Sequence, residues 1–249
     1  MTKTIIITGS TQGLGLQLGL YLLKKGNYIV FNYGHDDKQA NIARKKIENI
    51  NNNRFQIIKA DLSTYEETNK FFNRIKKTVG NVDILINNIG IARSGNILFL
   101  KKDLWHETIL TNLDSVYYCT KCFSKMEKES NNKNKIINIG SSLAFVGKMH
   151  EVAYSTSKAA LIGFTKTIAL DLSIFGIKVY LIFPPSIHSN LNKNGQRNYT
   201  LINNYCSFID SLCNDIFEFP SGSIINLNNK FKGGCNNVYT FFNEEDVGK

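Results

Sequence analysis

The chain has 249 residues, of which 43% are hydrophobic and 11% aromatic, enough to bury one large core, and we expect a single domain over residues 1–249. Its formal net charge of +10 comes from short basic groups with acidic residues among them, which favours an ordinary solvated surface and argues against a nucleic-acid-binding face. The opening residues lack the pattern of a secretory signal and no apolar run is long enough to span a bilayer, so we expect a cytoplasmic protein without membrane contact.

Seven apolar, β-branched runs alternate with helical stretches along the chain. They lie at residues 4–8, 28–32, 55–60, 83–87, 135–140, 178–183 and 223–227. Strands that are apolar throughout are typical of a parallel sheet covered by helices on both faces. We therefore predict an α/β fold with a Rossmann-like, doubly wound parallel sheet of about seven strands, in which ligands bind beyond the carboxyl ends of the strands.

The first predicted strand is followed by TGSTQGLG, a turn that contains Gly9, Gly13 and Gly15 and opens directly into a helix. Glycines there let the backbone turn tightly and approach a pyrophosphate, whose charge the N–H groups at the helix N-terminus can meet. The turn therefore predicts a dinucleotide site, although its spacing is T-G-x-x-x-G-x-G and not G-x-G-x-x-G.

Five cysteines, an odd number, fit reduced thiols better than a disulfide framework. Cys119 and Cys122 form a C-x-x-C, but they fall within a predicted helix over residues 112–129, whereas a redox pair needs its thiolate near a helix N-terminus. No second pair stands at zinc spacing. We expect these thiols to pack in the core, and we expect no metal site.

The stretch HEVAYSTSKAALIGFTK, residues 150–166, places Tyr154 four residues before Lys158. If this segment is helical, the two side chains share one face and an ammonium lies beside a phenol. Such a pair also arises by chance in a chain of this composition, so its meaning depends on the other motifs.

Together with the glycine turn, four further segments resemble the motifs of the short-chain dehydrogenase/reductase family, in the family's order. They are NNIG at 87–90, TNL with Asn112, INIGSS with Ser141, and YSTSK with Tyr154 and Lys158. The resemblance extends over essentially the whole chain. It implies an NAD(P)-dependent oxidoreductase that transfers hydride between a nicotinamide and a small carbonyl/alcohol substrate, with 3-oxoacyl groups, sugars and small ketones as candidates.

The resemblance also implies the catalytic roles. Tyr154 protonates the carbonyl oxygen, Ser141 hydrogen-bonds the same oxygen, and Asn112 supports a water-linked proton relay. Lys158 holds the nicotinamide ribose and lowers the pKa of the tyrosine, because a free phenol with a pKa near 10 is a weak acid that a neighbouring ammonium strengthens. In the alternative reading, Ser141 only ends a strand and Asn112 only caps a turn.

Further cofactor contacts are implied around these motifs. They are Leu14 in the glycine turn, Asp61 and Leu62 near the adenine ring, Asn87, Asn88 and Gly90 beside the adenosine, and Pro184, Ile187 and Ser189 near the nicotinamide carboxamide. An aspartate that follows a strand can instead cap a helix, which is the alternative for Asp61.

The choice between NAD(H) and NADP(H) depends on the end of the second strand. An acidic side chain there would bind the ribose 2′-hydroxyl and repel a 2′-phosphate. Tyr33, preceded by Asn32, occupies the position where NAD-preferring relatives have aspartate. We therefore favour NADP(H), although no arginine stands nearby and Asp36 and Asp37 follow closely.

The sequence departs from the family after the sixth strand. Pro185 replaces a glycine and Tyr180 an asparagine, while Ser189 keeps a hydroxyl at the position of a threonine. The segment from residue 186 to 223 is short and partly polar, which favours an open site or a polar substrate; His150 and His188 are further candidates for lining it. These departures keep a second hypothesis open, that of a dinucleotide-binding sensor or scaffold that has lost turnover.

The predicted helix 112–129 carries more large apolar side chains than one sheet face needs. They are Val116, Tyr117, Tyr118, Phe123 and Met126. The resemblance implies association through this helix and the helix that carries Tyr154, so we expect a homodimer or homotetramer.

Overall fold

A computed structural model of the chain describes residues 2–50, 53–130, 133–185, 199–227 and 238–240. Its centre is one sheet of eight strands in the order β3-β2-β1-β4-β5-β6-β7-β8, and every neighbouring pair is parallel. The strands are β1 (Thr4–Ile7), β2 (Tyr28–Tyr33), β3 (Phe55–Lys59), β4 (Ile84–Asn87), β5 (Lys135–Ile139), β6 (Lys178–Phe183), β7 (Ile224–Asn226) and β8 (Val238–Thr240). The predicted parallel α/β sheet is confirmed.

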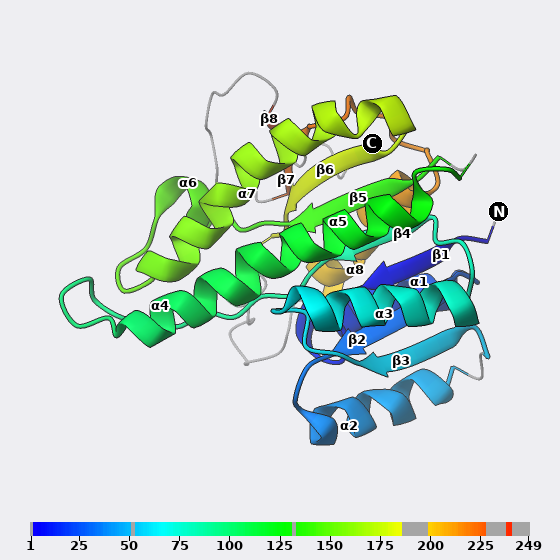
Figure 1. The fold of residues 1–249 in the computed structure, drawn as a ribbon, viewed down its shortest axis with the longest axis horizontal. Coiled ribbons are helices and arrows are strands. Elements are labelled where there is room, and N and C mark those ends of the chain that lie inside the picture. Colours follow the sequence, from blue (N-terminus) through cyan, green and yellow to red (C-terminus); the bar gives the residue numbers. More distant parts are fainter. Residues whose placement is uncertain (1, 51–52, 131–132, 186–198, 228–237, 241–249) are drawn as a thin grey trace.

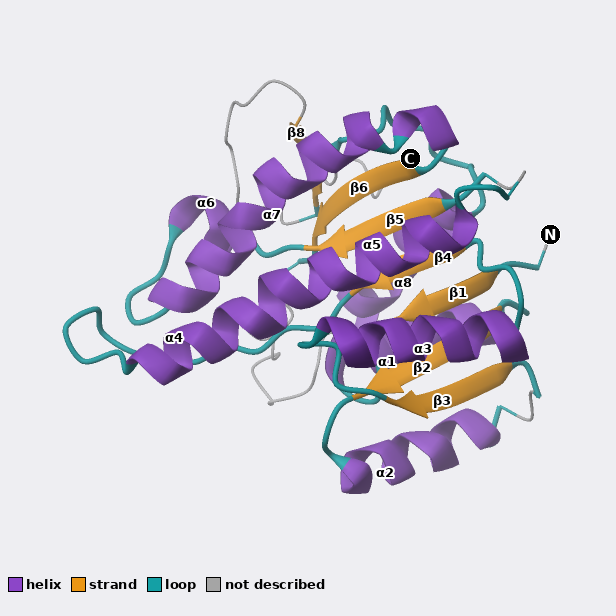
Figure 2. Cartoon of the chain, in the orientation of Figure 1, coloured by secondary structure: helices purple, strands orange, loops and turns teal. Residues whose placement is uncertain are grey.

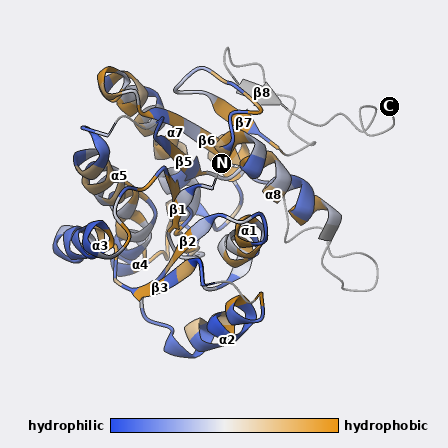
Figure 3. Ribbon diagram, turned by 90° about the vertical axis from the view of Figure 1, so that its right-hand side faces the viewer, coloured by the Kyte–Doolittle hydropathy of each residue, from blue (hydrophilic) through white to orange (hydrophobic). Residues whose placement is uncertain are grey.

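Helices cover both faces of this sheet, as Figures 1 and 2 show. One face carries α3 (Tyr65–Thr78), α5 (Ser115–Glu127) and α7 (Val152–Asp171), and the other carries α1 (Gly13–Lys24) and α8 (Tyr199–Cys213), while α2 (Asp37–Glu48) lies beside β3. Two short helices, α4 (Lys102–Ile109) and α6 (Leu143–Val146), lie beyond the arrowheads of the strands. The end-on view in Figure 3 shows the resulting three layers.

The core follows from the pattern of the strands. Because successive strand residues face opposite sides, apolar runs bury side chains against both helical layers. Ile7 and Phe31 pack with Leu18 of α1 on one side, and Ile6 packs with Phe123 of α5 on the other, all five without exposed surface. The sheet is therefore buried on both faces, which leaves its carboxyl-end edge as the place for a ligand.

Two predictions of element boundaries need correction. The structure adds an eighth strand, β8, after the seven predicted ones, and it pairs with β7. The predicted helix 112–129 is α5 preceded by a π-helical segment, Leu110–Asp114, that continues from α4. The π-helical segment contains Asn112, and such wider turns are frequently found at functional sites.

The strand order reverses beside β1. The chain moves outward from β1 to β2 and β3, then returns to place β4 on the other side of β1. The loops that follow β1 and β4 therefore diverge from a common point, the position at which doubly wound sheets bind ligands. The glycine turn follows β1 and the NNIG segment follows β4, so the predicted cofactor motifs meet there.

Candidate active site

The glycine turn has the conformation that its sequence predicts. Gly9 and Gly13 have φ angles of +58° and +55°, in the left-handed region that residues with a Cβ rarely adopt. A Cβ on Gly15 would collide with the side-chain amide of Asn88, so close packing also requires a glycine there. The turn thus brings the start of α1 close to the loop after β4.

The N-terminus of α1 is suited to an anion. Its N-cap residue, Gln12, makes no side-chain capping hydrogen bond, and its first turn contains no acidic residue. By contrast, Asp36 caps α2 and Thr64 caps α3 through their side chains, and both of those helices have acids in the first turn. The positive end of α1 therefore keeps its capacity to bind a phosphate, and the cradle fits the pyrophosphate of a dinucleotide.

Two asparagines fix the path of this turn. Asn32, at the end of β2, accepts a hydrogen bond from the Gly9 N–H at 3.1 Å and donates to the carbonyl of Ala60 at 3.1 Å. Asn88 donates to the carbonyls of Thr8 and Gly9 at 2.9 and 3.0 Å. Since Asn32 has no exposed surface, its side chain serves the predicted cofactor site by holding the glycine turn in place.

Leu62 is likewise completely buried, in the core beneath the edge, whereas Leu14 and Asp61 are partly exposed. Asp61 accepts a hydrogen bond from the Ser63 N–H at 3.0 Å, and its carboxylate lies 3.2 Å from Nε2 of His35. Burial acts to raise the pKa of Asp61, but the hydrogen bonds of Ser63 and the nearby His35 outweigh it and lower that pKa. Asp61 is thus an ionised acceptor at the predicted adenine edge.

Asn112 joins the loop after β4 to α7. Its side-chain oxygen accepts from the Ile91 N–H at 2.8 Å, and its amide nitrogen donates to the Ile91 carbonyl at 2.9 Å and to the Ser157 hydroxyl at 3.0 Å. A Cβ on Gly90 would lie 3.5 Å from this oxygen and 3.4 Å from Nζ of Lys158. The structure therefore packs Asn112, Gly90 and Lys158 together, as a shared site requires.

The three central catalytic candidates also converge. Ser141, in the turn after β5, forms a side-chain hydrogen bond with Tyr154 of α7. Lys158 lies one helical turn further along α7, with Nζ 6.0 Å from the centre of the Tyr154 ring. Nζ is buried and donates to the carbonyl of Ile139 at 2.8 Å. The serine bonds to the tyrosine and the lysine lies next to the tyrosine ring, as the motifs predict.

The surroundings of the tyrosine shift its pKa. Burial, opposed by the hydrogen bond of Ser141 and reinforced by the charge of Glu151, raises the pKa of Tyr154 above the usual value for a phenol. Burial also lowers the pKa of Lys158 to about 8, so this lysine is itself a weakened cation. The protein's own groups therefore make Tyr154 a weaker acid than a free phenol. Lys158 is not among the causes that set this pKa, so its expected lowering effect stays a prediction.

Glu151 is a residue of this site that the sequence analysis missed. It is the N-cap of α7, three residues before Tyr154, and it accepts a hydrogen bond from the Ser94 hydroxyl at 2.9 Å. Its other carboxylate oxygen is buried without a hydrogen-bond partner among the described residues. The spacing of one helical turn from Tyr154 was a signal that could have identified it.

Several predicted residues lie at or beyond the limit of the described chain. Pro184 and Pro185 follow β6 and are partly buried, but Ile187, His188 and Ser189 lie outside the described residues. The backbone carbonyl of His150 accepts from the Gly95 N–H at 2.7 Å, and its side chain is exposed. Within the described part of the chain, the His150 side chain forms no hydrogen bond or ion pair with the catalytic candidates.

Tyr180, the other departure on β6, is a core residue. Its side chain is buried, its hydroxyl donates to the Phe219 carbonyl at 3.3 Å, and burial raises its pKa to about 12. Tyr180 therefore stands where the family has an asparagine, but it belongs to the core and places no titratable group in the site.

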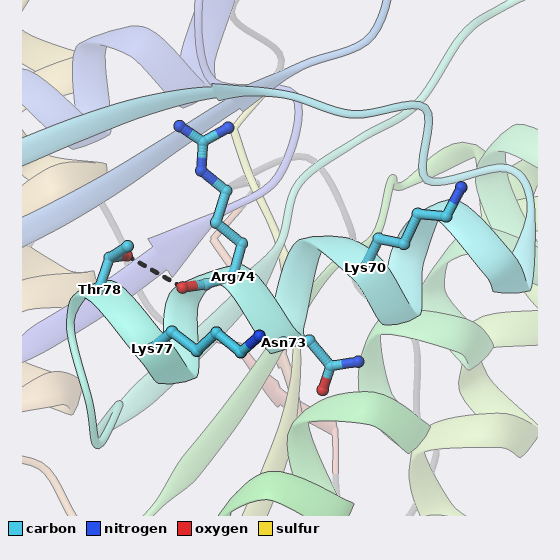
Figure 4. Close-up of a pocket in the computed structure, with 5 residues that line it drawn as sticks. All are labelled: Lys70, Asn73, Arg74, Lys77 and Thr78. Carbon is cyan, nitrogen blue, oxygen red and sulfur yellow. Dashed lines mark hydrogen bonds between the residues drawn. The ribbon is translucent and has the colours of Figure 1, made fainter.

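A surface hollow of about 350 Å³ lies elsewhere, on α3 (Figure 4). Its lining residues are Lys70, Asn73, Arg74, Lys77 and Thr78. The hydroxyl of Thr78 donates to the side chain of Gln56 at 3.2 Å, near the start of β3, so the hollow extends away from the carboxyl-end edge. It takes no part in the site described above.

The thiols of the described chain pack as predicted. Cys119 and Cys122 are buried on α5 and remain free, and burial raises the pKa of both. Within the described residues, no cluster of three or more histidine, cysteine or acidic side chains is placed to hold a metal ion. Among the helices described, none has both the length and the apolar character needed to cross a membrane.

Comparisons with known proteins agree with this geometry. Residues 3–200 match the family model described as short chain dehydrogenase. The chain is 33% identical over 192 residues to the 3-oxoacyl-[acyl-carrier-protein] reductase FabG of Buchnera aphidicola subsp. Baizongia pistaciae, covering 77% of this chain and 76% of that protein. It is also 33% identical over 192 residues to the enzyme of the same name from Aquifex aeolicus, covering 76% and 75%. The crystal structure of a short chain dehydrogenase from Mycobacterium smegmatis has the same fold, with a TM-score of 0.79, 18% identity, and coverage of 90% and 91%.

Proposed function

The chain belongs to the short-chain dehydrogenase family and is an NAD(P)-dependent oxidoreductase, and from this premise we propose that it reduces the carbonyl of a 3-oxoacyl group with NADPH. The observation that carries the proposal is the convergence of Ser141, Tyr154 and Lys158 beside the glycine turn. The similarity to two 3-oxoacyl-[acyl-carrier-protein] reductases supports the substrate class. Sugars and small ketones remain within the range of carbonyl compounds to be tested.

In the proposed reaction, the nicotinamide supplies the hydride when it is bound. The hydroxyls of Ser141 and Tyr154 both donate hydrogen bonds to the substrate carbonyl oxygen, which polarises the bond and orients the carbon. Tyr154 then gives its proton to this oxygen as negative charge develops there. Lys158 uses one N–H donor for the Ile139 carbonyl, and its two other donors are then available to the cofactor.

The environment of Tyr154 supports reduction as the working direction. A proton donor must carry its proton, and the burial that raises the pKa of Tyr154 keeps the phenol protonated around neutral pH. Alcohol oxidation would instead need the phenolate, which the same burial disfavours. The buried lysine and the hydrogen-bonded Asn112 provide a route by which the proton can be replaced after each turnover.

We propose NADP(H) as the preferred cofactor because β2 ends in Tyr33 where an acid would select NAD(H).

We further propose a homodimer or homotetramer. Tyr117 of α5 and Leu110 of the preceding π-helical segment are 43% and 42% exposed, and they leave two large side chains with apolar surface on the outer side of this helical region, beside Lys121 and Lys125. Light scattering during size-exclusion chromatography tests this; a monomer at micromolar concentration contradicts it.

The experiment that tests the proposed function is a titration of the purified protein with NADPH and NADH, followed by nicotinamide fluorescence, and then a turnover assay with 3-oxoacyl thioesters, sugars and small ketones. We expect NADPH to bind more tightly than NADH and the thioesters to be reduced. Binding of neither nucleotide would defeat the proposal, and turnover of only sugars or small ketones would replace the substrate class.

A further inference from the structure

The adenosine edge of the site lacks an arginine in the places where it would meet a 2′-phosphate. The turn TGSTQGLG contains no basic residue, and the five residues after Tyr33 are GHDDK. His35 of this segment already lies 3.2 Å from the carboxylate of Asp61. Apart from Lys38 at the end of this segment, a protein that prefers NADPH therefore has to supply the positive charge from another element.

Lys59 lies at the required place. It is the last residue of β3 and pairs in register with Tyr33, the last residue of β2, so both side chains emerge at the carboxyl-end edge. Its Nζ is 6.0 Å from the centre of the Tyr33 ring. Asp61, the predicted adenine contact, follows two residues later in the chain, in the turn after β3.

Lys59 and Tyr33 already hold an oxyanion of the chain itself. Nζ of Lys59 is 2.6 Å from one oxygen of the Asp37 carboxylate, and the Tyr33 hydroxyl donates to the other oxygen at 3.0 Å. The hydrogen bond from Lys59, followed by that from Tyr33, lowers the pKa of Asp37 and keeps it ionised. Two donors from two strands thus converge on one anion, as they would on a phosphate.

This interaction is of a kind that a ligand can replace. The side chains of Lys59 and Asp37 are 51% and 58% exposed, and ion pairs with that exposure contribute little to stability. The start of α2 does not depend on Asp37, because Asp36 is the N-cap and accepts from the Gln39 N–H at 2.9 Å. Asp37 can therefore turn away from Lys59 while α2 keeps its cap.

We propose that Lys59 and Tyr33 form the subsite for the 2′-phosphate of NADPH, and that the Asp37 carboxylate fills this subsite until the cofactor displaces it; the inference rests on the proposed function. A 2′-phosphate carries more negative charge than a carboxylate and offers more acceptor oxygens, so it competes successfully for the same donors. A ribose 2′-hydroxyl is uncharged and gains no ion pair from Lys59. Lys59 then determines cofactor specificity, and Asp37 weakens the binding of NADPH by competing with it.

The test uses the 249-residue protein and four variants, Lys59→Met, Asp37→Asn and the controls Lys38→Met and Lys70→Met. Lys70 forms an equally short exposed ion pair, 2.7 Å from Glu67 on α3, so its loss reproduces the change in net charge away from the site. Dissociation constants for NADPH and NADH are measured by nicotinamide fluorescence. Competition by 2′,5′-ADP and 5′-AMP gives the same comparison without a nicotinamide, and circular dichroism confirms folding.

We expect Lys59→Met to weaken NADPH and 2′,5′-ADP by about 10- to 100-fold while NADH and 5′-AMP change less than about twofold, the range for loss of a hydrogen bond to a charged group. Asp37→Asn should strengthen NADPH, because its competitor loses its charge, and Lys70→Met should change nothing. If wild type binds NADPH preferentially but Lys59→Met keeps the same NADPH-to-NADH ratio, the inference is overturned and the proposed function stands.

Two other outcomes also decide the matter. A wild-type protein that prefers NADH overturns the inference, since Lys59 would then remain with Asp37. A loss in Lys38→Met as large as that in Lys59→Met also overturns it, because Lys38 is the remaining cation of the segment after β2 and the effect would then be general surface charge. Failure of wild type to bind either nucleotide defeats the proposed function itself and is recognised separately.

Discussion

Among the described residues two lysines are buried, and their replacement by methionine should change stability in opposite directions. Lys158 is 3% exposed, and none of the described carboxylates forms an ion pair with it; its Nζ donates to the Ile139 carbonyl at 2.8 Å. Lys135 is 2% exposed but is well partnered, with Nζ 2.9 Å from the Asp215 carboxylate. Methionine preserves most of the apolar stem in both cases and removes the charge.

The cost of Lys158 follows from its pKa. Burial lowers this pKa from 10.5 to about 8, which corresponds to about 3 kcal/mol of lost stability while the lysine is charged. The penalty is complete below about pH 8, where both the folded and unfolded states are protonated, and it fades as the pH rises toward 10.5, where both become neutral. Loss of the donor to the Ile139 carbonyl offsets about 1–2 kcal/mol of the gain.

We therefore expect Lys158→Met to raise the free energy of unfolding by about 1–2 kcal/mol at neutral pH, and the gain to disappear near pH 10. Lys135→Met should lower it by about 3 kcal/mol, because Lys135 also donates to the carbonyls of Leu212 and Cys213 at the end of α8, each at 2.9 Å. Urea unfolding followed by circular dichroism at both pH values measures this. A destabilised Lys158→Met protein, or a gain independent of pH, would refute the reasoning.

Two further changes test how the site is held together. Asn112→Ala removes the three hydrogen bonds of a buried side chain and should cost about 2–4 kcal/mol of unfolding free energy and much of the turnover. Asn134 is a buried asparagine at the opposite edge of the sheet, so Asn134→Ala should cost stability but leave turnover unaffected, and equal turnover in the two variants would contradict the bridging role of Asn112. Glu151→Gln removes a charge that raises the pKa of Tyr154, so the loss of reductase activity at high pH should begin at lower pH, and a shift to higher pH would contradict the assigned electrostatics.

The sheet could be predicted from the sequence because its strands are apolar and β-branched on both faces, a pattern that few other structures produce. β8 escaped prediction because its three residues, VYT, are too few to show a period. The π-helical turn at Asn112 was not predicted for a different reason. An extra residue in one turn leaves the local helical pattern nearly unchanged, so only the tertiary contacts of Asn112 reveal it.

The motifs identify the candidate side chains that the structure brings together, but the electrostatics of these side chains could not be predicted from the sequence. Burial determines the pKa of Tyr154 and Lys158, and no local pattern shows that a lysine on a helix is buried, since lysine is usually exposed. The ion pair of Asp37 and Lys59 joins residues 22 positions apart, through the register of β2 and β3. Such contacts depend on strand pairing, which the spacing of charged residues alone does not specify.

The most direct test of the central claim compares wild type with Tyr154→Phe in the reduction of 3-oxoacyl thioesters by NADPH, followed by loss of the nicotinamide absorbance. The substitution removes the proton donor and keeps the ring, so we expect NADPH affinity within about twofold of wild type and turnover at least ~10²-fold lower. Turnover at the wild-type rate in Tyr154→Phe would contradict the mechanism. A wild-type protein that binds NADPH but reduces no carbonyl compound would instead identify a dinucleotide-binding protein without turnover.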